Sequence, residues 1–213
     1  MILKAKEIYK RFDKPSLVQV LSGISLEVQA GETVAITGKS GEGKSTLLHI
    51  LGTLEKPTEG EIFICGAQPT NLPEVRNRHI GFIFQTFNLL EDYSVLDNVL
   101  MPAKIGRRPL NTERALELLG EVGLSHRADF PAKLLSGGEK QRAAIARALC
   151  NDPDLILADE PSGNLDHAHS IAIHELLIGS AKKRNKALVI VTHDKELASL
   201  CDRTYLLMDG KLS

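Results

Sequence analysis

One short segment decides the fold: Gly38-Lys39-Ser40-Gly41-Glu42-Gly43-Lys44-Ser45-Thr46. It matches the pattern G-x-x-x-x-G-K-[ST], with an apolar run over 34–37 before it and a helical pattern over 44–51 after it. Glycines let backbone N–H groups approach a polyphosphate, and the helix N-terminus adds partial positive charge. Lys44 brings a full charge to the outer phosphates, and the Ser45 hydroxyl can ligate Mg²⁺. The segment therefore predicts a nucleotide-phosphate cradle at a strand–helix junction.

The alternative for this segment is an ordinary glycine-rich turn. At normal glycine usage the pattern should arise by chance in about one chain in a hundred of this length, and the strand–helix context lowers that further. The motif thus predicts ATP binding, whereas hydrolysis needs other groups.

Two acids, Asp159 and Glu160, end a second apolar run over 155–158. Ligands of open α/β sheets bind beyond the carboxyl ends of strands. Asp159 is then placed to hold Mg²⁺, and Glu160 to face the water that attacks the terminal phosphate. His193 follows a third run, 187–191, and can hydrogen-bond the γ-phosphate or that water. The alternative is that the two acids form a helix cap or a surface pair. Their occurrence in the same chain as the phosphate cradle disfavours that alternative.

The arrangement of runs predicts an α/β fold. Buried-strand runs alternate with helical patterns, which is typical of a mostly parallel sheet covered by helices. Alternating residues over 2–8, 24–28 and 61–64 predict a small antiparallel piece near the N-terminus. Residues 88–152 are dominated by helical patterns and predict an inserted helical subdomain. We expect a single domain over 1–213, with a nucleotide-binding core of 1–87 and 153–213.

Composition limits the partners. The formal net charge of −1 gives no electrostatic reason to expect nucleic acid, and the basic runs 107–108 and 182–184 are interpreted as solvated faces. No apolar stretch approaches the roughly 18 residues of a membrane span, and the N-terminus lacks the apolar run of a signal peptide. Any membrane contact is therefore expected through a partner.

Three cysteines, Cys65, Cys150 and Cys201, are far apart and lack C-x-x-C spacing. This pattern favours small core residues in a reduced compartment over disulfides or a zinc site. His167, His169 and His174 could suggest a metal cluster, but helix positions i and i+2 diverge, which disfavours it.

A further segment resembles the signature motif of ABC (ATP-binding cassette) ATPases: Leu135-Ser136-Gly137-Gly138-Glu139-Lys140-Gln141-Arg142. A serine hydroxyl and glycine amides at a helix start form an anion site, although a glycine-rich helix cap is the alternative. In that family the motif contacts the nucleotide of the opposite subunit. The resemblance implies that Ser136, Gly137, Gly138 and Glu139 contact the nucleotide of a second copy of this chain.

Other motifs of the same family occur in order. Gln85 resembles the Q-loop glutamine, which contacts Mg²⁺ or water, and 162–166 resembles the D-loop. His193 matches the switch histidine, so Glu160, His193 and Gln85 form the expected catalytic set. Phe12 lies where the family stacks an aromatic ring on adenine, with Tyr9 or simple core packing as alternatives. The implied fold is a P-loop NTPase with ABC ATPase architecture and a RecA-like mixed-sheet core.

Within the family, segments 52–60, 84–90 and 163–166 are most similar to ATPase subunits that release lipoproteins from the inner membrane. This implies a peripheral protein on the cytoplasmic side of that membrane, bound to integral membrane subunits. The alternatives are a cell-division ATPase that acts as a nucleotide-gated scaffold, an importer ATPase and a macrolide-type exporter.

The segment 87–93, Phe-Asn-Leu-Leu-Glu-Asp-Tyr, is unusually apolar for a connection. Such a patch suits a groove that receives a short amphipathic helix from the membrane partner. The alternative is that these side chains pack the helical subdomain onto the sheet.

Overall fold

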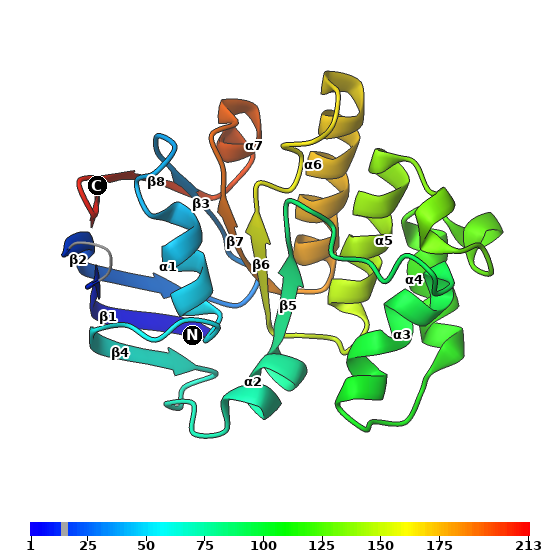
Figure 1. The fold of residues 1–213 in the computed structure, drawn as a ribbon, viewed down its shortest axis with the longest axis horizontal. Coiled ribbons are helices and arrows are strands. Elements are labelled where there is room, and N and C mark those ends of the chain that lie inside the picture. Colours follow the sequence, from blue (N-terminus) through cyan, green and yellow to red (C-terminus); the bar gives the residue numbers. More distant parts are fainter. Residues whose placement is uncertain (14–16) are drawn as a thin grey trace.

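A computed structural model describes residues 1–13 and 17–213 and contains a central six-stranded sheet (Figure 1). Five strands are parallel, and the last pairs antiparallel at the edge. In spatial order the strands are β5 (Ile80–Ile83), β6 (Leu155–Asp159), β7 (Ala187–Val191), β3 (Thr33–Thr37), β8 (Arg203–Met208) and β9 (Lys211–Leu212). The predicted runs at 34–37, 155–158 and 187–191 are all confirmed as strands.

The central strands are buried on both faces, which explains their continuous apolar sequences. Along β6, Leu155 and Leu157 belong to a core cluster with helix α1 (Lys44–Leu51). Ile156 and Ala158 point the other way, into a cluster with the remaining large helices. The sheet is therefore the middle of three layers.

A second, three-stranded antiparallel sheet covers the α1 side, in the order β2-β1-β4. Its strands are β1 (Leu3–Phe12), β2 (Val18–Val28) and β4 (Glu59–Ile64). Alternating side chains such as Leu3, Ile8 and Leu26 are buried in the same cluster as α1, while their neighbours face solvent. The predicted antiparallel piece is confirmed, and its strands extend beyond the predicted runs.

Helices cover the opposite face, with α6 (His167–Lys183) beside the sheet and a helical lobe beyond it (Figure 1). In the lobe, α3 (Val95–Ile105), α4 (Thr112–Glu121) and α5 (Gly137–Leu149) alternate with 3₁₀ turns η1 (Ser125–Arg127) and η2 (Ala132–Leu134). The two remaining helices are α2 (Leu72–His79), before β5, and α7 (Lys195–Ser199), after β7. The exact division at residues 88 and 152 stays a prediction. No helix among the described residues is long and apolar enough to cross a bilayer.

Two details of the sequence analysis are wrong. Cys65 is exposed in a turn after β4 rather than buried, whereas Cys150 and Cys201 pack half-buried against the core. The run 182–184 is not uniformly solvated, because the Arg184 side chain is only 10% exposed and pairs with Glu121 of α4. The sequence of one helix could not show this, because the pairing joins two distant helices.

Candidate functional site

The predicted chemical groups meet at one edge of the main sheet. Neighbouring parallel strands β5, β6, β7 and β3 are followed by Gln85, by the acids Asp159 and Glu160, by His193 and by the loop that starts at Gly38. Since parallel strands share their carboxyl edge, four segments far apart in sequence reach one place. This is the arrangement expected for a ligand site.

Backbone geometry explains the glycines of the 38–46 loop. Gly41 and Gly43 have φ of 86° and 94°, a region that side chains with a Cβ rarely adopt. A Cβ on Gly43 would also lie 2.5 Å from Val20 Cγ1. The loop then delivers the chain directly into α1, whose first backbone N–H groups are available to an anion.

Lys44 points back into its own loop. Its Nζ donates to the carbonyl oxygens of Gly38 at 2.8 Å and Lys39 at 2.9 Å. The residue is 9% exposed, so its charge is held among backbone dipoles at the loop centre. An ammonium fixed there is placed to reach phosphate oxygens that the same loop cradles.

The Ser45 hydroxyl donates to Asp159 Oδ1 at 3.1 Å, which joins the cradle to the end of β6. Burial raises the pKa of Asp159, and the bond from Ser45 partly offsets this. A hydroxyl and a carboxylate side by side are oxygen donors of the kind Mg²⁺ prefers, so the residues fit the predicted ion.

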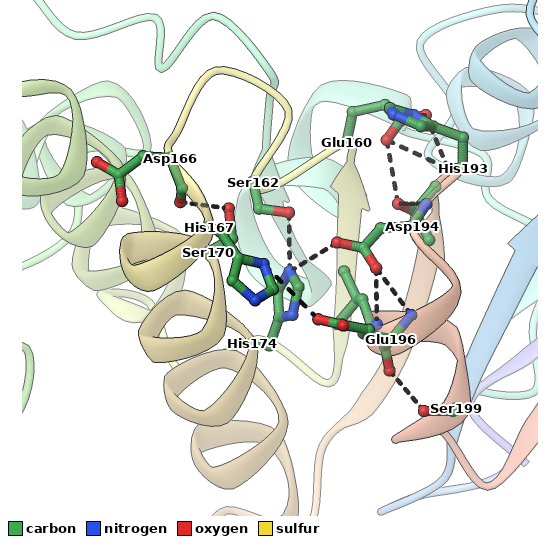
Figure 2. A network of polar contacts seen from close by, with 12 residues as sticks. Glu160, Ser162, Asp166, His167, Ser170, His174, His193, Asp194, Glu196 and Ser199 are labelled. Atoms are coloured by element: carbon green, nitrogen blue, oxygen red, sulfur yellow. Dashed lines mark hydrogen bonds and ion pairs between the residues drawn. The ribbon is translucent and has the colours of Figure 1, made fainter.

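Glu160 leaves the strand direction sharply, with a φ of 44°. Its backbone N–H donates to Val191 O at 2.9 Å, and its carboxylate accepts from Thr192 Oγ1 at 3.0 Å and from the His193 backbone at 3.1 Å. His193 Nδ1 also lies 2.9 Å from Glu160 Oε1 (Figure 2). The Glu160 carboxylate is 14% exposed and is held in place by these bonds. The His193 imidazole is 72% exposed and therefore accessible to a ligand.

Gln85 is exposed and meets the 162–166 segment. Its backbone carbonyl accepts from Asn164 Nδ2 at 2.8 Å, and its Nε2 lies 3.2 Å from where a Gly163 Cβ would stand. The two segments that resemble the Q-loop and D-loop are therefore in direct contact. A change at either segment can be transmitted to the other.

The signature segment forms the start of α5. Ser136 is the N-cap: its Oγ accepts from Glu139 N at 3.3 Å, while Glu139 Oε2 accepts from Ser136 N at 2.8 Å. That backbone bond is the main reason why the pKa of Glu139 is lowered. Ser136 and Gly137 are exposed, and Gly138 packs near His169 at the start of α6. The helix cap is confirmed, whereas contact of the exposed Ser136 and Gly137 with a nucleotide stays a prediction.

Phe12, at the end of β1, is 40% exposed, and Lys10 Nζ lies 4.8 Å from its ring centroid. The Tyr9 hydroxyl instead packs against Gly23 in the small sheet. Phe12 is thus the more accessible ring, and its stacking on adenine stays a prediction.

Sequence analysis missed the part played by His174. It lies in α6, 2% exposed, with Nε2 2.8 Å from Ser162 Oγ and 3.6 Å from Asp194 Oδ2 (Figure 2). Burial lowers its pKa, and Asp194 offsets this in part. The available signal was its position on the buried face of α6, with Ser170, Ile173 and Leu177.

Comparison with known proteins agrees with this geometry. The family model described as ABC transporter matches residues 21–163. Lipoprotein-releasing system ATP-binding protein LolD of Protochlamydia amoebophila is 55% identical, with 100% of this chain and 96% of that protein covered. The LolD protein of Cytophaga hutchinsonii is 48% identical over 98% and 97% of the two chains.

Solved structures of ABC transporter cassettes share this fold. The dimeric structure of MJ0796, a bacterial ABC transporter cassette, has a TM-score of 0.90 and 38% identity, over 100% of this chain and 97% of that one. A post-hydrolysis dimer of the same cassette, bound to ADP and Pi, matches equally well. This chain belongs to the ABC transporter family and is one of its ATP-hydrolysing subunits.

Proposed function

We propose that this ATPase drives a membrane complex that releases lipoproteins from the inner membrane. The observation that carries the proposal is identity of 46–55% along nearly the whole chain to relatives named as lipoprotein-releasing ATP-binding proteins. The protein then sits on the cytoplasmic side of that membrane and is held there by its partners.

In the proposed reaction the amides of the 38–46 loop and Lys44 bind the phosphates. Ser45 and Asp159, with Gln85, would hold Mg²⁺, which would supply positive charge to the phosphates when bound. Glu160 takes a proton from the attacking water, and His193 makes a hydrogen bond to the γ-phosphate or to that water. The short bonds around the Glu160 carboxylate keep it aimed at one position.

The site is completed by a second copy. One chain carries one cradle and one signature segment, and the exposed Ser136 and Gly137 offer an anion site to a neighbour's nucleotide. Two ATP molecules would then lie between two chains, and hydrolysis would release the dimer. The dimeric state of the solved cassette supports this arrangement.

The surface for the membrane partner lies beside β5. A groove of about 560 Å³ there has largely apolar walls, among them Leu54, Phe82, Phe84, Leu90, Met101 and Ile105. Leu90 is 43% exposed and Ile105 72% exposed, which favours a docking surface over simple packing. The groove has the character that an amphipathic helix requires.

This groove is tied to the loop that follows Gln85. Arg147 of α5 donates to the carbonyls of Phe87 and Asn88, and buried Asn98 bonds both the N–H and the C=O of Leu90. Movement of a helix in the groove would therefore shift the segment that carries Gln85. The contacts give a direct route between partner and nucleotide.

The groove is tested by Leu90→Asp, and the exposed end of the 87–93 segment, outside the groove, is tested by Tyr93→Asp. Leu116→Asp of α4 is a control of similar exposure outside both. Each variant is compared in thermal melts, ATP binding and pull-down of the membrane subunits. We expect Leu90→Asp and Tyr93→Asp to fold and bind ATP but to lose the partner, while the control retains it. Retained pull-down with a normal melt would exclude the groove, and a collapsed melt would support the packing alternative.

Lipoprotein release is tested by depleting the protein in cells and fractionating the inner and outer membranes. Lipoproteins should accumulate in the inner membrane, and the complex purified in detergent should contain subunits that bind them. Normal lipoprotein sorting, or co-purification with cell-division or importer subunits, would contradict the proposed cargo while leaving the ATPase intact.

A further inference from the structure

Three potential metal ligands meet at the edge of the sheet opposite the nucleotide site. Cys65 lies in the turn after β4, His79 ends α2, and Asp154 precedes β6. Their ligand atoms all lie within 4.8 Å of one another, the single such group found among residues 1–13 and 17–213. Sγ of Cys65 is 3.6 Å from Nδ1 of His79, which is 2.6 Å from Oδ2 of Asp154.

The backbone holds these three residues in place. Cys65 N–H donates to Ile2 O at 2.8 Å, and Asp154 N–H donates to His79 O at 3.1 Å. The carbonyl of Asp154 in turn accepts from Ala187, at the start of β7. The backbone of each ligand residue is therefore tied to a neighbouring segment, as a preorganised site requires.

In the metal-free site the Cys65 thiol keeps its proton, so a bound cation must displace it. Burial and the neighbouring Asp154 carboxylate raise the pKa of the Cys65 thiol to about 11, because a thiolate would lie beside another anion. A divalent ion between them removes that repulsion and allows the thiol to lose its proton.

We propose that Cys65, His79 and Asp154 bind one divalent cation of the Zn²⁺ type, with water as the fourth ligand. Tetrahedral Zn²⁺ places N, O and S ligands about 3.3–3.6 Å apart. The observed Sγ–Nδ1 distance already fits. The Asp154 carboxylate, 40% exposed, must turn outward by about 0.7 Å to match.

This site differs from the nucleotide site in place and in chemistry. Asp154 and Asp159 lie at opposite ends of β6, about 16 Å apart at ordinary strand rise. Thiolate and imidazole select Zn²⁺ or Co²⁺, whereas the all-oxygen set near Asp159 suits Mg²⁺. A bound ion would link the turn after β4, the end of α2 and the start of β6. It would lie next to the start of β5, the strand that leads to Gln85.

The alternative is a plain His79–Asp154 ion pair beside a protonated thiol. Cobalt distinguishes the two, since a thiolate bound to Co²⁺ gives an intense near-ultraviolet charge-transfer band that oxygen ligands do not. The experiment titrates Co²⁺ into the full, metal-stripped chain without nucleotide or Mg²⁺. We expect one equivalent per chain to produce the band, Zn²⁺ to displace it, and the melting temperature to rise on loading.

Variants locate the ligands. Cys65→Ser should abolish the band. His79→Ala should weaken Co²⁺ binding by about a hundredfold or more, since even loss of a group that only hydrogen-bonds a metal ligand costs about ten- to a hundredfold. Cys150→Ser and Cys201→Ser are matched controls and should keep the band. The proposal is overturned if the folded wild-type chain gives no band, or if the band survives in a folded Cys65→Ser variant.

Discussion

The two halves of the nucleotide site in one chain are built differently. The cradle side gathers three charged groups at the ends of two strands: the Lys44 ammonium after β3, and the Asp159 and Glu160 carboxylates at the end of β6. The signature side offers only the Ser136 hydroxyl and backbone amides at the start of one helix. The cradle side therefore supplies the charged groups and the proton acceptor, and the signature side supplies hydrogen-bond donors that position the ligand.

Their internal contacts differ in the same way. Lys44 is 9% exposed and bound by its own loop, whereas Ser136 is exposed and makes only a local helix cap. A substitution in the cradle should therefore weaken ATP binding by a single chain. A substitution in the signature segment should affect only the hydrolysis that requires two chains. The predictions below test that distinction.

The largest effect is expected from Lys44→Ala. The side chain makes its bonds to two carbonyls of the ligand loop, so its loss should spare the core. Removal of a charged donor costs about 1.5–3 kcal/mol per hydrogen bond, so the ATP Kd should rise by about a hundredfold. Calorimetric titration measures it, with Lys6→Ala, an exposed lysine outside the cradle, as control. Unchanged affinity in Lys44→Ala would refute the cradle assignment.

Glu160→Gln should affect turnover rather than binding. The amide can still accept from Thr192 and the His193 backbone but cannot take a proton from water. Hydrolysis should fall by about 10²-fold or more, the usual size of a general-base effect. ATP should then trap a dimer that size-exclusion chromatography detects. Exposed Glu175→Gln is the control, and nearly normal turnover would assign the chemistry elsewhere.

Ser136→Arg tests the signature side. A bulky cation at the exposed cap should block the shared site and hydrolysis while the monomer still binds ATP, because the cradle is untouched. Ser136→Thr keeps the cap and should retain activity. An equal loss of monomer binding would place Ser136 in its own chain's site.

Mixing Ser136→Arg with Lys44→Ala chains sharpens this test. One composite site in the heterodimer then carries both defects and the other carries neither, so ATPase activity should return relative to either variant alone. No recovery, although the heterodimer forms, would show that the two sites must act together.

The same comparison explains what the sequence could predict. The cradle and its helix were predictable because their chemistry is contiguous over nine residues. At the signature, the serine and glycines predicted a helix start, and α5 begins there at Gly137, but the Ser136–Glu139 capping box that stabilises this start was not predicted. The apolar 87–93 segment was recognised, but its anchoring by Arg147 was not.

Contacts made by topology alone could not be predicted. Cys65, His79 and Asp154 lie 14 and 75 positions apart and meet only because β4, α2 and β6 share one edge. His174 was considered only as a member of a metal cluster, which the divergence of helix positions i and i+2 at His167 and His169 disfavoured. Periodicity could not show that its inner neighbours would be the D-loop and the segment after His193.

The smallest and most specific effect concerns His174, a positioning residue between those two segments. Its ring contacts Ser162, which follows Glu160, and lies near Asp194, which follows His193 and caps α7. We expect His174→Leu to leave the Ser162 hydroxyl buried without its partner and to cost about 1–3 kcal/mol of stability. Turnover should fall several-fold while the KM for ATP stays nearly unchanged, because His174 does not belong to the cradle.

The pH dependence separates this role from simple packing. The charged and titratable groups facing His174 are Asp194 and Glu196, which raise its pKa, and His167, which lowers it; burial outweighs them, so the folded pKa is depressed. The unfolded chain then binds more protons below about pH 6.5, and the folded state loses stability as pH falls through that range. Urea unfolding of wild type should show this loss, and His174→Leu should show less of it. His174→Gln, which can still bond Ser162, should recover turnover but not the pH dependence, and His126→Leu, an exposed histidine far from both loops in the sequence, should change neither. Equal turnover in the Leu and Gln variants would reduce His174 to core packing, because only a hydrogen-bonding side chain can link the two loops.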